Sequence, residues 1–172
     1  DRAPLAAAMP GVTPGFQQAT LSFGRHRVIT LDTLDEDASA APSGVLCDAR
    51  LRDLEARLKA AEGQIITLVM HHPPAPFGMP FFDPIGLRNG AEVLRLASEA
   101  GVTLILCGHV HRSVTTVASG LPIVSLRSTA FALSPADTAR GVAPDPDAPP
   151  GYAVLMLGED GPVLHAETCS GL

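Results

Sequence analysis

The sequence predicts an α/β domain with a parallel sheet at its centre. Helical and apolar stretches alternate over residues 48–107 in the order helix, strand, helix, strand, which is typical of a parallel βαβ unit. The chain has 172 residues, of which 46% are hydrophobic, so it is long enough to build one hydrophobic core. No internal repeat divides it. We therefore expect residues 1–172 to form a single domain.

The first part of the chain predicts a β-hairpin followed by a helix. β-prone runs at 18–23 and 26–32 flank a Gly-Arg turn. Residues 48–61 predict a helix, with Asp48 as its N-cap and basic residues near its end. One face of this helix is apolar and carries Leu51, Leu54 and Leu58.

Two buried strands are predicted on either side of a second helix. Residues 64–70 and 102–107 are nearly continuous apolar runs, as expected for strands that are covered on both faces. Between them, residues 89–100 are predicted to be helical, with Asn89 and Glu92 in the positions of a capping box.

The rest of the chain predicts further β structure. Residues 113–119 and 121–126 form short β-prone runs around a glycine, and 151–157 and 162–169 flank a Glu-Asp-Gly hairpin signal. Residues 134–150 are rich in Pro, Ala and Asp and are predicted to form a loop.

Composition and charge argue against several classes of function. The chain has 12 basic and 18 acidic residues and a net charge of −6, whereas binding to a nucleic-acid polymer needs clustered Lys and Arg. No apolar run is long enough to span a membrane, and none resembles a secretory signal. Cys47, Cys107 and Cys169 are odd in number and widely spaced, which fits a reducing compartment. We therefore expect a cytoplasmic protein without membrane attachment.

Four of the six histidines lie in two short segments that follow the predicted buried strands. These are His71-His72-Pro73-Pro74 and Gly108-His109-Val110-His111. The carboxyl ends of neighbouring parallel strands share one rim, where ligands of α/β sheets bind. In an extended segment, His109 and His111 point to the same side. His71, His109 and His111 could therefore hold a divalent transition metal.

Other notable side chains have simpler explanations. Adjacent residues of an extended chain point apart, so His72 can equally be a structural residue. His26 and His165 lie in predicted hairpins and are expected on the surface. Cys107 ends a buried strand and is expected to pack as an apolar thiol.

The histidine motifs resemble those of the calcineurin-like metallophosphoesterases. The similar branch contains the bacterial class III cyclic-nucleotide phosphodiesterases and glycerophosphodiesterases. The motifs that carry the resemblance are, in order, Met70-His71-His72-Pro73-Pro74, Asp83-Pro84-Ile85, Asn89-Gly90 and Cys107-Gly108-His109-Val110-His111. The resemblance implies a four-layer αββα sandwich with two mixed sheets, of which this chain is the C-terminal portion.

The resemblance also implies a reaction. The family's site holds two metals bridged by an Asp and by a water or hydroxide, and the metal-bound hydroxide attacks the phosphorus of a phosphodiester. By motif matching, His71 and His109 would ligate one metal and His111 the other, with Mn, Fe, Zn or Co as candidates. His72 and Asp83 would support the ligands or touch a small-molecule substrate such as a cyclic nucleotide or a glycerophosphodiester.

Three upstream motifs of the family are absent from the sequence: Asp-x-His, Gly-Asp-x-x-Asp and Gly-Asn-His-Asp. Asp1-Arg2 resembles the residues that follow the last of these, so the chain is expected to begin just after it. Three neutral imidazoles cannot offset two divalent cations, so we expect the isolated chain to be inactive. Its open sheet edge is expected to pair with a second copy or with the missing N-terminal segment.

Two further classes of function remain open from the residues alone. One is a mononuclear metal-binding module that uses the same three histidines without hydrolysis, and the other is an assembly piece that docks through its sheet edge. Two interpretations also remain for the loop after the first histidine segment. Phe77, Phe81 and Phe82 either form an apolar wall of the site or pack the loop down, and Asp83 either positions a ligand or begins a turn.

Overall fold

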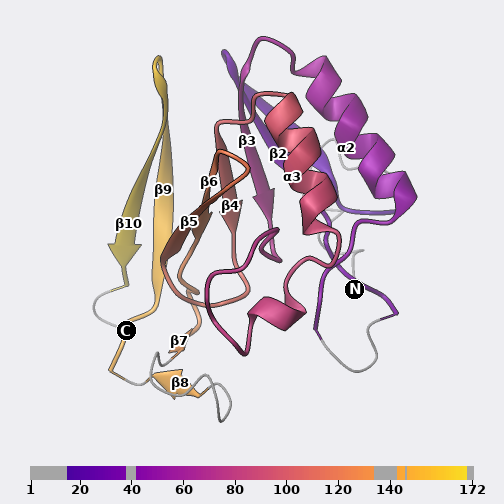
Figure 1. Ribbon diagram of the computed structural model, residues 1–172. Coiled ribbons are helices and arrows are strands. Elements are labelled where there is room, and N and C mark those ends of the chain that lie inside the picture. The colour runs from indigo at the N-terminus through magenta and orange to yellow at the C-terminus, as the bar shows by residue number, and fades with distance from the viewer. Residues whose placement is uncertain (1–14, 38–41, 134–142, 146, 170–172) are drawn as a thin grey trace.

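The centre of the molecule is a six-stranded mixed sheet in the order β1-β2-β3-β4-β6-β5 (Figure 1). This is a computed structural model that describes residues 15–37, 42–133, 143–145 and 147–169. The strands are β1 (Ala19–Phe23), β2 (His26–Thr30), β3 (Ile65–Met70), β4 (Leu104–Cys107), β5 (Val114–Ala118) and β6 (Leu121–Ser125). β2, β3, β4 and β6 run parallel, and β1 and β5 are antiparallel strands at the two edges. The parallel core, the predicted hairpin before it and the two short strands predicted after it are confirmed.

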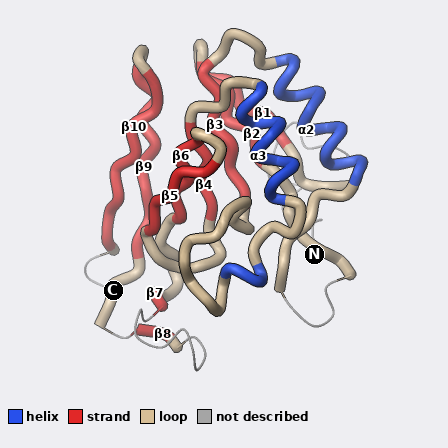
Figure 2. The backbone as a smooth tube through the Cα atoms, viewed as in Figure 1, coloured by secondary structure: helices blue, strands red, loops and turns tan. Residues whose placement is uncertain are grey.

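Two helices link the parallel strands and pack against each other. α2 (Asp48–Ala60) lies between β2 and β3 in the chain, and α3 (Gly90–Glu99) lies between β3 and β4. Crossovers between parallel strands are right-handed, so strands added in one direction receive their helices on one face. Figures 1 and 2 show the two helices side by side on the same side of the strands.

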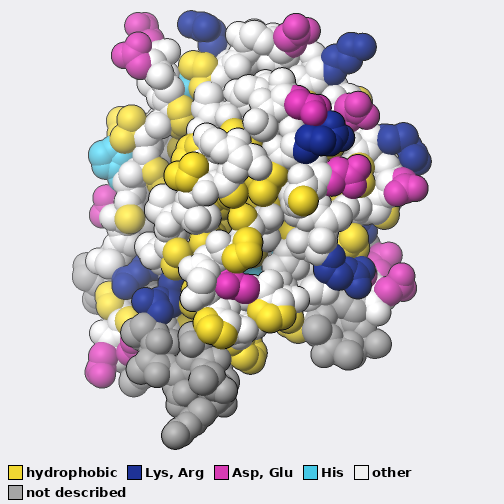
Figure 3. Space-filling view, viewed as in Figure 1, with side chains coloured by type: hydrophobic (Ala, Val, Ile, Leu, Met, Phe, Trp, Pro, Cys, Tyr) yellow, Lys and Arg dark blue, Asp and Glu magenta, His cyan; other side chains and the backbone are white. Residues whose placement is uncertain are grey.

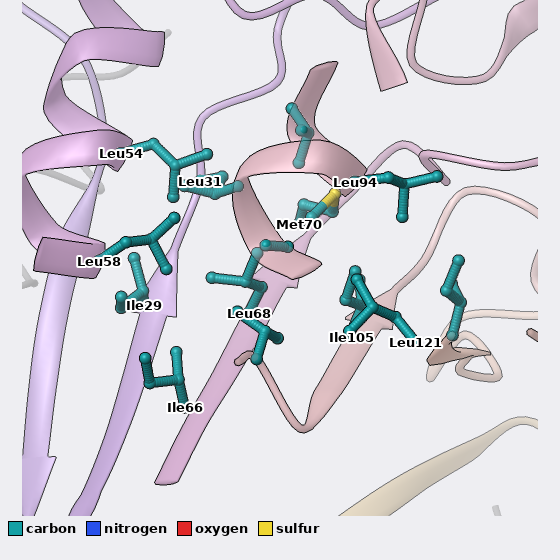
Figure 4. Packing of buried hydrophobic residues seen from close by; sticks show 14 of the residues in the cluster. Ile29, Leu31, Leu54, Leu58, Ile66, Leu68, Met70, Leu94, Ile105 and Leu121 are labelled. Atoms are coloured by element: carbon teal, nitrogen blue, oxygen red, sulfur yellow. The ribbon is translucent and has the colours of Figure 1, made fainter. Parts of the chain in front are cut away.

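The main core lies between these helices and the sheet (Figure 4). Alternate residues of β3 point to the helices because strand side chains alternate with period two. From the sheet and its continuation the core receives Ile29, Leu31, Ile66, Leu68, Met70, Ile105 and Ile123, and from the helices Leu54, Leu58, Val93, Leu94 and Ala97. This packing fixes the strand ends that carry the histidine segments.

Both predicted helix caps are wrong in detail. Cys47, not Asp48, occupies the N-cap position of α2, and Asp48 lies in the first turn, where its charge suits the helix dipole. Asn89 does occupy the N-cap position of α3, but its side chain does not cap the helix. Instead, its Nδ2 donates to the carbonyl of Leu46 at 2.8 Å, and its Oδ1 accepts from the N–H of Leu46 at 3.0 Å. The side chain of Asn89, which the local pattern predicts to cap the helix, instead bonds to a backbone segment that is distant in the chain.

The predicted C-terminal hairpin is confirmed as β9 (Gly151–Gly158) and β10 (Gly161–Thr168), which lie away from the helices in Figure 1. His26, expected on the surface, is buried, because the hairpin turn reaches back to it. Its Nε2 donates to the carbonyl of Gly158, 2.8 Å away and 132 positions along the chain. No local pattern could predict so distant a contact. His165 is exposed, as predicted.

The predicted loop 134–150 falls largely outside the described residues. The part that is described contains β8 (Pro144–Asp145), which pairs with β7 (Ala132–Leu133) in a small antiparallel sheet. Over the described ranges, the chain therefore forms one mixed sheet, this short pair and the β9-β10 hairpin. The mixed α/β architecture is as predicted.

Charged side chains of both signs spread over the helices in Figure 3. Hydrophobic side chains gather over the loop between β3 and α3, which contains the short 3₁₀ helix η1 (Asp83–Ile85). None of the described helices is both long enough and apolar enough to cross a membrane.

We expect Asn89→Ala to lower the free energy of unfolding by about 1–3 kcal/mol, because it leaves the buried backbone of Leu46 without its two partners. Arg95→Ala removes an exposed ion pair with Glu99 on the same helix and is expected to change stability by less than about 1 kcal/mol. Urea unfolding of the two variants measures the difference, and equal effects would contradict the role of Asn89.

Candidate metal centre

The two histidine segments begin at the same level of the sheet. β3 and β4 are parallel neighbours, and their last residues, Met70 and Cys107, pair with each other. His71 and Gly108 come directly after them, and the N–H of Gly108 donates to the carbonyl of His71 at 3.0 Å. The prediction that both segments share one rim at the carboxyl ends of the strands is confirmed.

The segment after β4 is not extended, so the period-two argument for His109 and His111 is wrong. Both residues have a left-handed backbone, with φ of 71° and 51°. Val110 between them is fully buried, and its N–H donates to the carbonyl of Gly108 at 2.8 Å. Such a backbone costs about 1–3 kcal/mol per non-glycine residue and persists only where the surroundings hold it. A tight turn around the buried valine, not a strand, brings both histidines to one cavity.

His71 and His109 face each other across this rim. Nε2 of His71 lies 3.4 Å from Nδ1 of His109. Two imidazole nitrogens bound to one tetrahedral metal at about 2.0–2.1 Å lie about 3.3 Å apart. The pair therefore has the spacing of two ligands of a single metal, and imidazole suits Zn and Fe among the candidate metals.

His72 lies beside this pair, but its nitrogens are already engaged. Ligand atoms of His71, His72 and His109 all lie within 4.8 Å of one another. However, Nδ1 of His72 lies 2.8 Å from the hydroxyl of Thr33, and its Nε2 lies 3.0 Å from the carbonyl of Pro42. Neither nitrogen keeps a free lone pair for a metal. His71 and His109 are therefore the two members of this cluster with nitrogens suited to coordination.

His111 lies in the same cavity with one nitrogen available. Its Nδ1 donates to the carbonyl of Phe131 at 3.2 Å, and the rings of His111 and Phe131 contact each other at a tilt of 52°, with centroids 4.5 Å apart. A metal-binding histidine commonly donates its other N–H to a carbonyl, which fixes the tautomer and the ring orientation. Nε2 of His111 is the nitrogen left for a ligand.

An open cavity of about 730 Å³ surrounds these side chains. Its wall combines the end of β2, the ends of β3 and β4, and the segment after β6, including Thr30, Asp32, Val69, Leu106, Arg127 and Thr129. His71, His109 and His111 all line it. The cavity is wide enough for a small-molecule substrate beside the histidines.

The electrostatics of the site keep the imidazoles neutral. Burial, followed by the repulsion from neighbouring histidines, lowers the pKa of His72 and the pKa of His109 to about 4. Burial and then His111 also lower the pKa of His71. The neutral form is the one that binds metals, so the nitrogens of this cluster are available at neutral pH.

The loop after the first histidine segment is closed by Asp83. Its two carboxylate oxygens accept the N–H groups of Phe77 and Met79, each at 2.9 Å, which favours the turn over the ligand-positioning alternative. Phe82 is buried with its ring 5.5 Å from that of His109, and Phe81 is exposed. None of the three phenylalanines lines the cavity, so packing of the loop accounts for them better than an apolar wall does.

Sequence reasoning missed the residues that support His72. Thr33, Gly44 and Arg50 carry no motif, and they meet His72 or its loops only in the fold. Cys107 behaves as predicted, since it is buried and desolvation raises the pKa of its thiol to about 12. It is therefore an uncharged packing residue and no nucleophile.

The chain is similar in sequence to several bacterial phosphodiesterases. A probable cyclic nucleotide phosphodiesterase of Rhodopseudomonas palustris is 35% identical over 95% of the chain and 61% of its own length. The 3′,5′-cyclic adenosine monophosphate phosphodiesterase CpdA of Pseudomonas aeruginosa is 28% identical over 94% of the chain and 57% of its own length. The glycerophosphodiester phosphodiesterase GpdQ of Enterobacter lignolyticus is 33% identical over 56% of the chain and 35% of its own length. The chain thus spans less than two thirds of each of these relatives, and no family model matches it.

Solved structures show the same fold. A dimetal phosphatase of Danio rerio superposes with a TM-score of 0.65 at 17% identity, over 89% of this chain and 58% of that one. GAP50, the anchor in the inner membrane complex of Plasmodium, superposes with a TM-score of 0.60 at 16% identity, over 93% of this chain and 51% of that one. At these identities the likeness concerns the fold alone.

The fold is that of a calcineurin-like dimetal phosphatase. The homologues of the chain are bacterial cyclic nucleotide and glycerophosphodiester phosphodiesterases.

The metal-free chain is expected to lose stability as the pH falls. The pKa of His72 and that of His109 are about 4 in the folded state, against 6.5 when exposed. Between these values the unfolded state binds more protons, so the stability is fully present above the unfolded pKa and is lost toward the folded one. Each histidine adds a slope of up to about 1.4 kcal/mol per pH unit.

Urea unfolding in the presence of a chelator, from about pH 7 down to about pH 5, measures this slope. His165→Gln, which alters an exposed side chain, is the control and should retain the same slope. A flat profile in the unsubstituted chain would contradict the burial of neutral His72 and His109.

Proposed function

We propose that this protein hydrolyses small-molecule phosphodiesters, of the cyclic nucleotide or glycerophosphodiester type, at a binuclear metal centre. The observation that supports this most directly is the 3.4 Å approach of His71 Nε2 to His109 Nδ1 at the rim of a cavity that His111 also lines. The names of the homologues supply the substrate class, because those relatives are phosphodiesterases.

In this proposal His71 and His109 hold one divalent metal and His111 holds the second, with Mn, Fe, Zn or Co as candidates. Such metals, when bound, polarise phosphoryl oxygens and make a nucleophile of water at neutral pH. The chain itself holds the imidazoles in fixed orientations. The turn around Val110 orients His109, and the carbonyl of Phe131 orients His111.

The histidine cluster lacks the negative charge that a binuclear metal centre needs. The three side chains of the described cluster are all neutral imidazoles, and no carboxylate lies among them. Two divalent cations held close together need anionic ligands, and a carboxylate can bridge them where an imidazole cannot. We therefore propose that the 172-residue chain alone is inactive or nearly so.

Pairing with another chain or segment is a related proposal. β1 and β5 lie at the two edges of the six-stranded sheet, and the β9-β10 hairpin has a further pair of edges. Such edges present unpaired backbone groups that another strand can join. A second copy or a segment that carries the absent motifs are the two candidates.

A mononuclear metal-binding function is the second candidate. The three candidate ligands, His71, His109 and His111, are all imidazoles that line one cavity, and a set of three histidines suits one transition metal better than two. Metal stoichiometry separates the two candidates.

Titration of the chain with Zn²⁺ or Mn²⁺ by calorimetry is expected to show binding that His71→Ala abolishes and that His165→Ala does not. His165 is exposed on β10 and serves as the matched control. One metal per chain, unchanged when the absent motifs are supplied in a longer chain, would favour the mononuclear module. Two metals in the longer chain support the proposed centre.

Hydrolysis of bis(p-nitrophenyl) phosphate with added Mn²⁺ tests the activity. The chain alone is expected to show no turnover above that of the buffer with metal, and a longer chain with the absent motifs is expected to turn over. Enzyme-like rates from the chain alone would overturn the proposed inactivity, and an inactive longer chain would overturn the proposed function.

A further inference from the structure

His72 is buried beside the two histidines that are proposed to hold the metal. Its ring centroid lies 4.8 Å from that of His71 and 4.7 Å from that of His109, so its ring is in contact with both. The residue is 6% exposed. It therefore acts on the geometry of the pair without a free nitrogen of its own.

The hydrogen bonds of His72 select one tautomer. Nε2 faces the carbonyl of Pro42, which can only accept, so Nε2 carries the proton. Nδ1 is then an acceptor, and the hydroxyl of Thr33 is the donor at 2.8 Å. The same hydroxyl oxygen lies 3.4 Å from the backbone nitrogen of His72 and accepts its N–H. One threonine thus holds both the ring and the backbone of His72.

The two loops around this slot are tied together by Arg50. Its buried guanidinium donates through Nη1 to the carbonyls of Asp32, Leu34 and Val45, at 3.1, 2.7 and 3.0 Å. Asp32 and Leu34 flank Thr33, and Val45 follows Gly44. Arg50 on α2 therefore fixes the backbone on both sides of Thr33.

Gly44 closes the other side of the slot. A Cβ at this position would lie 2.5 Å from Cγ and Nδ1 of His72, so only a glycine allows the ring to sit where it does. Gly44 itself is anchored, because its N–H donates to Gly86 at 3.1 Å and its carbonyl accepts from Arg88 at 2.9 Å. The ring of His72 is thus held from two sides and by two hydrogen bonds.

We propose that Thr33 is a positioning residue of the metal centre: its hydroxyl occupies Nδ1 of His72, which keeps His72 from coordinating the metal and makes its ring the support that aims His71 and His109 at a shared metal. The inference rests on the proposed metal site. Residues that orient metal ligands in this way typically change metal affinity about 10-fold to 100-fold when substituted.

Thr33→Val removes the hydroxyl and keeps the shape of the side chain, and Thr33→Ser keeps the hydroxyl. We expect the dissociation constant for Zn²⁺, measured with the metal alone and a competing chelator, to rise about 10-fold to 100-fold in Thr33→Val. Thr33→Ser should bind nearly as tightly as the unsubstituted chain. Leu58→Ala, a core substitution on the far part of α2, should lower the thermal midpoint without changing Zn²⁺ affinity.

The tautomer of His72 gives a second readout that general destabilisation does not move. Long-range ¹H–¹⁵N correlation spectra of the metal-free chain should show His72 protonated at Nε2 alone, and Thr33→Val should move the ¹⁵N resonance of Nδ1, which loses its hydrogen-bond donor. If Thr33→Val does not fold, the spectrum of the unsubstituted chain still decides, because protonation at Nδ1 would overturn the proposal.

The outcomes separate the two proposals. If the unsubstituted chain and the longer chain both fail to bind Zn²⁺, the proposed metal site is wrong. If the chain binds Zn²⁺ and Thr33→Val binds it equally well with an unchanged His72 spectrum, the metal site stands and the role of Thr33 is wrong.

Discussion

The parallel register of β3 and β4 is the constraint on which the site depends. Because Met70 pairs with Cys107, the two strands end at the same level, and the residues after them start side by side. The packing of α2 and α3 against one face of the sheet holds that register, since a slip of one residue would turn Ile66, Leu68 and Met70 away from the core. The hydrophobic core therefore holds the two imidazole nitrogens 3.4 Å apart, and no local hydrogen bond has to supply the free energy for this approach.

The sequence predicted the elements well and the side-chain contacts poorly, for a physical reason. Periodicity and turn residues depend on neighbours in the chain, so the βαβ core and both hairpins followed from them. His26, Asn89 and the segment of His109 depend on partners far along the chain or on a strained backbone, and each differs from its prediction. The rim shared by the histidines was predictable because it follows from topology alone.

The candidate site combines a strained backbone, buried imidazoles and a lack of carboxylates in the described histidine cluster. The left-handed backbones of His109 and His111 are costly. Burial lowers the pKa of His72 and the pKa of His109 to about 4, which leaves these two rings neutral at neutral pH. The chain spans 61% of the length of the Rhodopseudomonas palustris relative, and the described histidine cluster holds no carboxylate. Both facts support the proposal that the chain contributes one side of a metal centre.

The most direct test is a crystal structure of the chain grown with Mn²⁺ or Zn²⁺ and measured at the absorption edge of the metal. The account predicts an anomalous peak about 2.0–2.2 Å from both His71 Nε2 and His109 Nδ1, with His72 still bonded to Thr33 and Pro42. A peak on a nitrogen of His72, or a metal bound with His71 and His109 turned apart, would contradict it.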